Sequence, residues 1–163
     1  MSDAQATVIV DWARRLDAAG IEYWLFGGWA VDYHAGRVTR LHEDVDFVIW
    51  TRDHEAVIEM LRAADFAPLR PPLAFIRSGV EFEITLIERA QDGAIVTPGF
   101  EDWPWDAGTF GDEVRALNGY PVRVVSVAGL LAVKTGWEAH FGEPPRPQDL
   151  ADAQLLQQLQ VSD

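Results

Sequence analysis

Apolar residues recur along this chain with two different periods, which predict both helices and strands. Between Val8 and Leu16 they recur at helical spacing, so we expect a helix over 3–19 that ends at Gly20. The aromatic and branched run 21–26 follows between two glycines and predicts a first strand. The chain therefore begins with a helix that leads into a strand.

The central part of the chain contains three further strand patterns. Residues 45–50 form a nearly continuous apolar run, as expected for a strand covered on both faces. "LAFIRS" and "VEFEITLIER" predict a hairpin that turns at Ser78-Gly79, with Ile87 on the polar side of its second strand. Between these patterns we expect a helix capped by Asp53, whose buried stripe would be Ala56, Val57, Met60, Leu61 and Ala64.

A loop, a hairpin and more helices complete the pattern. Residues 91–110 have the composition of a loop, whereas Asn118-Gly119 separates two strand-like halves and signals a hairpin. Helices are expected over three further ranges: 29–35, about 127–141 and about 148–159. Strands interrupted by helices early and joined as hairpins later predict an α+β fold, a mixed α/β sheet with helices packed on it.

Composition and charge narrow the classes of function. The formal charge is −13, from 26 acidic and 13 basic residues, so nucleic acid is a disfavoured partner and a cationic small molecule a favoured one. The chain has no cysteine, which excludes a disulfide framework and a thiolate metal site. With no secretory signal and no apolar run of membrane length, we expect a cytoplasmic protein that has no membrane partner.

Two aspartates interrupt the start of the apolar strand 45–50 and suggest a metal site. Asp44 and Asp46 lie on the same face of an extended strand, roughly 6.6 Å apart, while Val45 faces the core. Such a pair can hold Mg²⁺, which prefers a few carboxylates together with substrate phosphates. The alternative is that both are solvated residues at the start of a strand.

Other residues could complete a nucleotide site around these aspartates. By the same alternation, Glu81 and Glu83 share one face of their strand, and one of them could bind metal or act as general base. Gly27-Gly28 stands between a strand and a helix, where the backbone can approach a phosphate. Three basic or imidazole side chains lie between the glycines and the aspartates: Arg37, Arg40 and His42.

These motifs resemble a known superfamily. Gly-Gly after a strand, Asp-x-Asp in the next strand and an acid in a later one are similar to the nucleotidyltransferases with a DNA polymerase β-like palm. "GGWAVD…GRVTRLHEDVDF" resembles the small antibiotic-modifying branch, the aminoglycoside 2″-adenylyltransferases and lincosamide nucleotidyltransferases. The resemblance implies one nucleotidyltransferase domain, 1–163, with a palm-like core at 1–125 and C-terminal helices at 126–163.

The resemblance also implies roles for individual residues. Asp44, Asp46 and Glu81 would bind one or two Mg²⁺ ions, with Glu83 as the alternative third carboxylate. The phosphates of a nucleoside triphosphate would be bound by five residues: Gly27, Gly28, Arg40, His42 and Lys134. The implied reaction is in-line attack of an acceptor hydroxyl on the α-phosphorus, with the glutamate accepting the proton and AMP from ATP as the group transferred.

The acceptor site is expected in the loop that contains Trp103 and Trp105, beside Glu101 and Asp102, because aromatic faces and acids could hold an amine-bearing sugar. An aminoglycoside is favoured over a lincosamide. The rival interpretations are a non-catalytic, antitoxin-like nucleotide-binding module and an enzyme that modifies protein or RNA. The assembly would be a monomer or a homodimer.

Simpler structural roles remain open for several of these residues. Trp29 is expected in the core, and His42 could merely hydrogen-bond a loop. Asp32 could cap its helix or pair within it, and Asp149 could be an N-cap. Lys134 could pair with Glu138, four residues later on the same helix. Trp103 and Trp105 could form a small apolar cluster under the loop.

Overall fold

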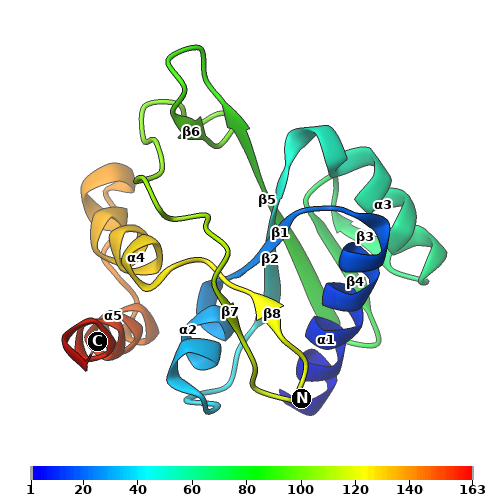
Figure 1. The fold of residues 1–163 in the computed structure, drawn as a ribbon, viewed down its shortest axis with the longest axis horizontal. Helices are drawn as coiled ribbons and strands as arrows, with labels where there is room; N and C mark the ends of the chain where they lie inside the picture. The colour runs from blue at the N-terminus through cyan, green and yellow to red at the C-terminus, as the bar shows by residue number, and fades with distance from the viewer. Residues whose placement is uncertain (1, 163) are drawn as a thin grey trace.

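A computed structural model describes residues 2–162 and contains a mixed sheet flanked by helices (Figure 1). The strands are β1 (Tyr23–Phe26), β2 (Asp44–Trp50), β3 (Ala67–Arg70), β4 (Ala74–Arg77), β5 (Val80–Arg89), β6 (Ile95–Val96), β7 (Val114–Arg115) and β8 (Val122–Arg123). The α-helices are α1 (Ser2–Ala19), α2 (Gly27–Ala35), α3 (His54–Ala63), α4 (Val127–Phe141) and α5 (Pro147–Ser162), and a short 3-10 helix spans Thr51–Asp53.

The main sheet has the spatial order β1-β2-β5-β4-β3, with β6 paired to the end of β5. β2 and β5 are parallel, and the other pairs of this sheet are antiparallel. In Figure 1, α1 and α3 lie on one side of the sheet, and α2, α4 and α5 lie on the other. This arrangement confirms the predicted mixed α+β class.

Aromatic packing fixes the centre of the sheet. Trp12 on α1 and Phe82 on β5 are fully buried, with ring centroids 5.2 Å apart. Phe47 on β2 stacks on Phe82 at 5.3 Å. Burial of one such side chain contributes roughly 1.5–3 kcal/mol. The two central strands are therefore held rigidly by their apolar faces.

Several boundaries agree with the sequence-based predictions, and others differ by one to three residues. The hairpin turn at Ser78 and Gly79 is confirmed, and both residues have positive φ, 51° and 78°. The first strand begins at Tyr23 rather than at residue 21. Helix α2 begins at Gly27, two residues before the predicted start, so the glycine pair forms its N-terminus.

Three predictions about single residues were wrong. Asp53 precedes α3 but its side chain makes no capping hydrogen bond. Ala56, assigned to the buried stripe of that helix, is exposed. Ile87, assigned to the polar side of its strand, is fully buried, because both faces of β5 are covered at this end and neighbouring Leu86 also packs on the core.

Strand β3 was not predicted. All four of its residues are exposed, and Pro68 lies within it, so it shows neither apolar alternation nor a typical strand composition. The predicted hairpin around Asn118-Gly119 is present as β7 and β8, which pair antiparallel. Its strands are two residues long and are joined by the six residues 116–121, a longer connection than a tight turn.

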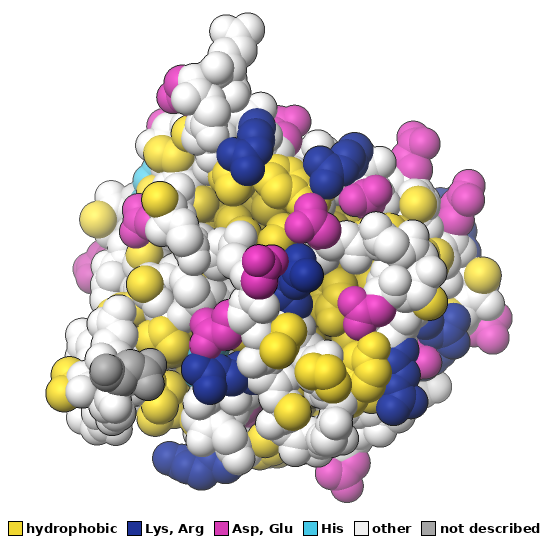
Figure 2. All heavy atoms as spheres, in the orientation of Figure 1, with side chains coloured by type: hydrophobic (Ala, Val, Ile, Leu, Met, Phe, Trp, Pro, Cys, Tyr) yellow, Lys and Arg dark blue, Asp and Glu magenta, His cyan; other side chains and the backbone are white. Residues whose placement is uncertain are grey.

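Charges of both signs are interspersed on the face shown in Figure 2, with apolar side chains visible between them. Within residues 2–162, no helix combines the length and the apolar composition that crossing a bilayer requires. The buried apolar cluster runs from Val8 on α1 to Leu156 on α5, so the C-terminal helices pack into the same core as the sheet.

Candidate active site

Four carboxylates share one face at the junction of β2 and β5. In the parallel register, Asp44 lies beside Glu81 and Asp46 lies beside Glu83. Val45, between the two aspartates, is 0% exposed and points into the core. Carboxylate oxygens of Asp44, Glu81 and Glu83 all lie within 4.8 Å of one another. The structure thus brings together the four acids that the sequence analysis selected.

The pKa values of the two aspartates reflect this crowding. Removal from water raises the pKa of Asp46 well above its usual value, and the charges of Asp44 and Glu83 raise it further. Removal from water also raises the pKa of Asp44, with the charge of Glu83 adding to the effect. A divalent cation would relieve this repulsion, and a set of carboxylate oxygens suits Mg²⁺. The residues present therefore fit the predicted magnesium ion.

Arg70, which ends β3, already contacts this acidic cluster. Its Nη2 lies 2.5 Å from Glu83 Oε1 and 3.5 Å from Glu81 Oε2. The side chain is largely exposed, so the ion pair is screened by solvent. Arg70 was not predicted to contact the site, because its strand carries no recognisable pattern.

The glycine pair is required by close approach of the backbone to the site. A Cβ on Gly27, whose φ is +65°, would overlap Asp46 Oδ2. A Cβ on Gly28 would lie 2.5 Å from both Arg40 Nη2 and His42 Nδ1. The N-terminus of α2 therefore lies directly beside the carboxylates, where its free N–H groups favour an anion.

The side chains of Arg40 and His42 are held by buried acids. Arg40 Nε and Nη2 donate to the two carboxylate oxygens of Asp152 on α5, at 3.2 and 2.9 Å. His42 Nε2 lies 2.5 Å from Asp32 Oδ2, and these side chains are 3% and 0% exposed. Asp32 also accepts from Thr39 Oγ1, so it fixes the loop before β2 and neither caps nor pairs within its own helix.

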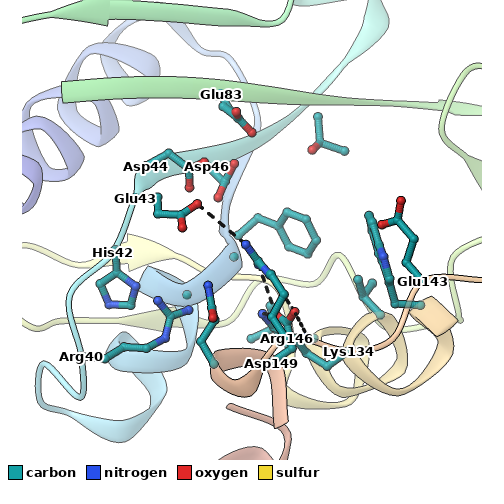
Figure 3. Close-up of a pocket in the computed structure, with 18 of the residues that line it drawn as sticks. Arg40, His42, Glu43, Asp44, Asp46, Glu83, Lys134, Glu143, Arg146 and Asp149 are labelled. Carbon is teal, nitrogen blue, oxygen red and sulfur yellow. Dashed lines mark hydrogen bonds and ion pairs between the residues drawn. The ribbon is translucent and has the colours of Figure 1, made fainter. Parts of the chain in front are cut away.

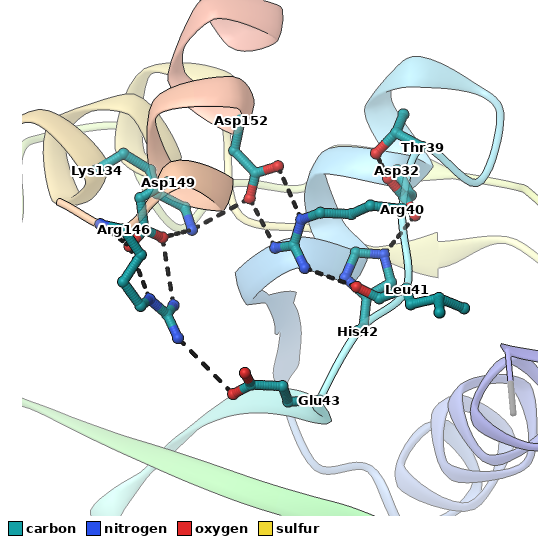
Figure 4. A network of polar contacts seen from close by, with 10 residues as sticks. All are labelled: Asp32, Thr39, Arg40, Leu41, His42, Glu43, Lys134, Arg146, Asp149 and Asp152. Atoms are coloured by element: carbon teal, nitrogen blue, oxygen red, sulfur yellow. Dashed lines mark hydrogen bonds and ion pairs between the residues drawn. The ribbon is translucent and has the colours of Figure 1, made fainter.

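Figure 4 shows how these contacts continue into a network on α4 and α5. Lys134 Nζ lies 2.7 Å from Asp149 Oδ1 and 3.2 Å from Asp152 Oδ2. Arg146 Nε lies 2.9 Å from Asp149 Oδ2, and Arg146 Nη1 reaches Glu43, beside the aspartates, at 3.7 Å. Burial opposes ionisation of Asp149, but hydrogen bonds from Arg146 and Lys134 hold its pKa well below its usual value.

Two predictions are corrected by this network. Lys134 pairs with Asp149 and Asp152 on the next helix, not with Glu138. Asp149 is the third residue of α5 rather than its N-cap, and its carboxylate accepts from the backbone N–H of Arg146 at 3.3 Å. Arg146 was not among the predicted site residues, although its position just before a helix, in a proline-rich segment, could have indicated it.

A cavity of about 520 Å³ joins these groups, and we call it the charged cleft (Figure 3). Its lining includes nine charged side chains: Arg40, Glu43, Asp44, Asp46, Glu83, Lys134, Glu143, Arg146 and Asp149. Gly27, Gly28 and His42 also line it. The cleft therefore contains nearly every residue predicted to bind metal or nucleotide, except that Glu81 is not part of its wall.

A second cavity of about 460 Å³ adjoins the first, and we call it the aromatic pocket. The cavities share four wall residues: Phe26, Thr85, Val133 and Trp137. Five aromatic side chains besides Phe26 line the pocket: Phe100, Trp103, Trp105, Trp137 and Phe141. The ring of Trp103 stacks on that of His140, with centroids 4.4 Å apart. A Cβ on Gly136 would lie 2.9 Å from the ring of Trp103.

The two loop acids assigned to acceptor binding do not line this pocket. Asp102 is 81% exposed and lies 3.6 Å from His140. Glu101 accepts a hydrogen bond from the backbone N–H of Gly99 at 2.9 Å. Trp103 and Trp105 do line it, so the structure separates the aromatic part of that prediction from the acidic part.

Comparisons with known proteins relate the chain to one family of enzymes. Residues 8–156 match the model of the aminoglycoside-2″-adenylyltransferase family. A 2″-aminoglycoside nucleotidyltransferase of Escherichia coli is 38% identical over 64 residues, which are 37% of this chain and 36% of that protein. The aligned segment thus spans about a third of the curated relative.

Solved structures with the same fold extend over nearly the whole chain. ANT(2″)-Ia in complex with adenylyl-2″-tobramycin has a TM-score of 0.73 and 17% identity, covering 99% of this chain and 94% of that one. The lincosamide antibiotic adenylyltransferase LnuA, with lincomycin bound, has a TM-score of 0.69 and 19% identity, covering 96% of each chain. These two structures share the fold of this chain, and the family model that matches residues 8–156 shows that the chain belongs to the aminoglycoside-2″-adenylyltransferase family.

Proposed function

We propose that this protein transfers a nucleoside monophosphate, AMP from ATP, to a hydroxyl group of a small-molecule antibiotic in a magnesium-dependent reaction. The observation that carries the proposal is the charged cleft, in which Asp44, Asp46 and Glu83 face the N-terminus of α2. Carboxylates that attract a hard cation and a helix terminus that attracts phosphate are combined there. A nucleoside triphosphate with Mg²⁺ matches both.

Each wall of the cleft has a distinct task in this proposal. Bound Mg²⁺ would be held by Asp44 and Asp46 and would neutralise charge on the reacting phosphate. Gly27 and Gly28 let the triphosphate approach the backbone N–H groups of α2. Lys134 and Arg146 donate to the phosphate oxygens that leave as pyrophosphate.

Glu83 is the better candidate for the third carboxylate and general base. It lines the charged cleft and lies beside Asp46, whereas Glu81 lies one pair further from the cavity. In the step itself, the acceptor oxygen bonds to the α-phosphorus, the bond to pyrophosphate breaks, and the hydroxyl proton passes to Glu83. This choice reverses the preference for Glu81 that the sequence resemblance implied.

Two acceptor classes are supported by the comparisons. The family match and the tobramycin adduct of ANT(2″)-Ia support an aminoglycoside, in line with the net charge of −13. The fold of lincomycin-bound LnuA and the apolar walls of the aromatic pocket support a lincosamide as the second candidate. The E. coli relative aligns over 36% of its length, so we propose its activity for this chain on the basis of a partial alignment.

The reaction is tested by incubating purified protein with Mg²⁺, ATP and each drug, followed by mass spectrometry of the drug and assay of pyrophosphate. We expect a drug product heavier by one adenylyl group and an equal amount of pyrophosphate. Omission of Mg²⁺ and replacement of ATP by GTP test the cofactor and the donor. ATP binding without any product across the panel would instead support the non-catalytic nucleotide-binding module.

The expected setting follows from the same properties. We infer a cytoplasmic enzyme that acts as a monomer or a homodimer and does not use nucleic acid as acceptor. The excess of 26 acidic over 13 basic residues supports the last point, because a polyanionic acceptor would be repelled. Sedimentation analysis with and without ATP tests the oligomeric state.

A further inference from the structure

The aromatic pocket differs chemically from the loop that was expected to hold a cationic sugar. Among the described residues that line it, Asp106 is the one charged side chain. The indole N–H of Trp105 donates to Thr97 Oγ1 at 2.9 Å, and the hydroxyl of Thr109 donates to the carbonyl of Asp106 at 2.6 Å. With these donors satisfied internally, the pocket presents mainly ring faces and aliphatic groups to an occupant.

The pocket begins beside the proposed general base. Thr85, which lines both cavities, follows Glu83 by two residues on β5, so their Cα atoms lie roughly 6.6 Å apart on the same face. A molecule held in the pocket can therefore direct one hydroxyl to Glu83 while its body stays on the aromatic walls. This position suits an acceptor, because the attacking oxygen must enter from the cleft wall that carries the base.

Charge in the two cavities limits how many ammonium groups an acceptor can carry. In the proposed reaction Asp44 and Asp46 would hold the metal and Glu83 would take the acceptor's proton, whereas Glu43 and Asp149 already contact Arg146. Apart from Asp44 and Asp46, the described lining carboxylates for which the structure gives no cationic partner are Glu143 and Asp106. A polycation would have to bury further ammonium groups against apolar walls, which is costly.

We infer that the acceptor is an amphiphilic hydroxyl compound that places a broad apolar face in the aromatic pocket and carries no more than two positive charges. This inference rests on the proposed nucleotidyl transfer and specifies its substrate class. Phe100 and Trp137 carry the selectivity, since both rings line the pocket and remain 42% and 40% exposed to an incoming ligand. Aromatic stacking adds to the gain from apolar burial.

The test measures binding separately from transfer. Titration calorimetry uses the full chain with Mg²⁺ and a non-hydrolysable ATP analogue, with lincomycin as the amphiphilic probe and tobramycin as the polycationic probe. We expect lincomycin to bind and tobramycin to bind at least about tenfold more weakly. Phe100→Ala should weaken lincomycin binding about tenfold, because one stacking surface is lost. Leu150→Ala is the matched control, since Leu150 is exposed on α5 and lies outside both cavities.

A second variant tests the volume of the pocket. Ala132→Leu on α4 narrows the pocket without touching the charged cleft, and it should weaken lincomycin binding while the affinity for the ATP analogue stays unchanged. Weaker binding of the ATP analogue in this variant or in Phe100→Ala would overturn the inference, because the pocket would then hold the nucleotide base.

The remaining outcomes separate this inference from the proposed function. Lincomycin that binds through Phe100 but is never adenylylated upholds the inference on the pocket and contradicts the proposed transfer. A third outcome is that tobramycin is adenylylated, that its binding is unaffected by Phe100→Ala, and that lincomycin does not bind. This outcome upholds the proposed transfer and overturns the inferred acceptor class. Failure of lincomycin to bind in a Phe100-dependent way overturns the inference in every case.

Discussion

The two adjoining cavities, about 520 and 460 Å³, are similar in volume and opposite in chemistry. The charged cleft is lined by acids and bases, four of which (Glu43, Lys134, Arg146 and Asp149) pair with one another, whereas the aromatic pocket is lined by rings and aliphatic groups. A transferase with two unlike substrates needs such a division. Charged side chains must be held in a fixed orientation to stabilise a reacting phosphate. An apolar surface, by contrast, contributes binding free energy in proportion to the area that it buries.

The two cavities are also held together differently. Long-range ion pairs build the charged cleft: Arg40 before β2 contacts Asp152, 112 residues later on α5. Close packing of a loop on a helix builds the aromatic pocket, where Trp103 lies against Gly136 of α4. Polar variants should therefore affect nucleotide chemistry, and variants of exposed rings should affect the acceptor.

The largest expected effect is on the acidic wall of the charged cleft. Asp46→Asn removes a charge that would hold the metal, and we expect the transfer rate to fall about 100- to 1,000-fold, measured as pyrophosphate release at saturating ATP. Phe100→Ala, by comparison, should raise the KM for the acceptor and leave the rate at saturating acceptor nearly unchanged.

A melting curve in EDTA controls for misfolding of this variant. The pKa of Asp46 is raised, so its ionised form is disfavoured in the fold, and Asp46→Asn should melt at the same or a higher temperature without metal. A variant that melts earlier and loses activity would indicate a structural role instead.

The next effect decides between the two glutamates. Glu83→Gln should lower the rate about 100-fold because the acceptor proton loses its base, while Glu81→Gln should change it less than about tenfold. The two side chains lie on the same strand and both contact Arg70, so each variant controls for the other. Equal losses in both would contradict the assignment of the base to Glu83 alone, and a larger loss in Glu81→Gln would restore the preference for Glu81.

A smaller effect is expected at the basic wall of the cleft. Arg146→Gln should raise the KM for ATP about tenfold, because one charge-assisted contact to the triphosphate is lost, with little change in the acceptor KM. Arg37→Gln is the control, since Arg37 is exposed and lines neither cavity. An unchanged KM for ATP in Arg146→Gln would leave this residue with a structural role only.

The parts of the site that could be predicted from the sequence depend on strand alternation and local spacing. Asp44 and Asp46 share a face because strand side chains alternate. Helix α4 has the bounds predicted from the sequence, and in the structure Ser126 caps its start while Gly142 ends it in a left-handed conformation. The mixed sheet followed from the same patterns.

Contacts between distant segments could not be predicted from strand alternation and local spacing. No spacing rule relates Arg40 to Asp152, or Asp32 to a histidine ten residues later in a loop. The directions of Glu101 and Asp102 depend on how the loop folds against α4, so composition alone placed them in a site that their side chains do not line.

The smallest predicted effect concerns stability and tests whether charge or apolar packing holds each cavity. Asp149→Asn should lower the free energy of unfolding at neutral pH by about 1–3 kcal/mol, because Lys134 and Arg146 lose a charged acceptor. The pKa of Asp149 is lowered in the fold from about 3.9 in an unfolded chain, so its contribution is complete above that value. As pH falls below that value, the unfolded chain takes up a proton at Asp149 while the folded protein keeps the carboxylate ionised, so the gap between the variant and the parent protein should narrow, as measured by urea unfolding between pH 3 and 7. Phe100→Ala removes an apolar contact, so the difference in free energy of unfolding between this variant and the parent protein should not change with pH. A pH-independent difference for Asp149→Asn would mean that packing, rather than ion pairs, also stabilises the charged cleft.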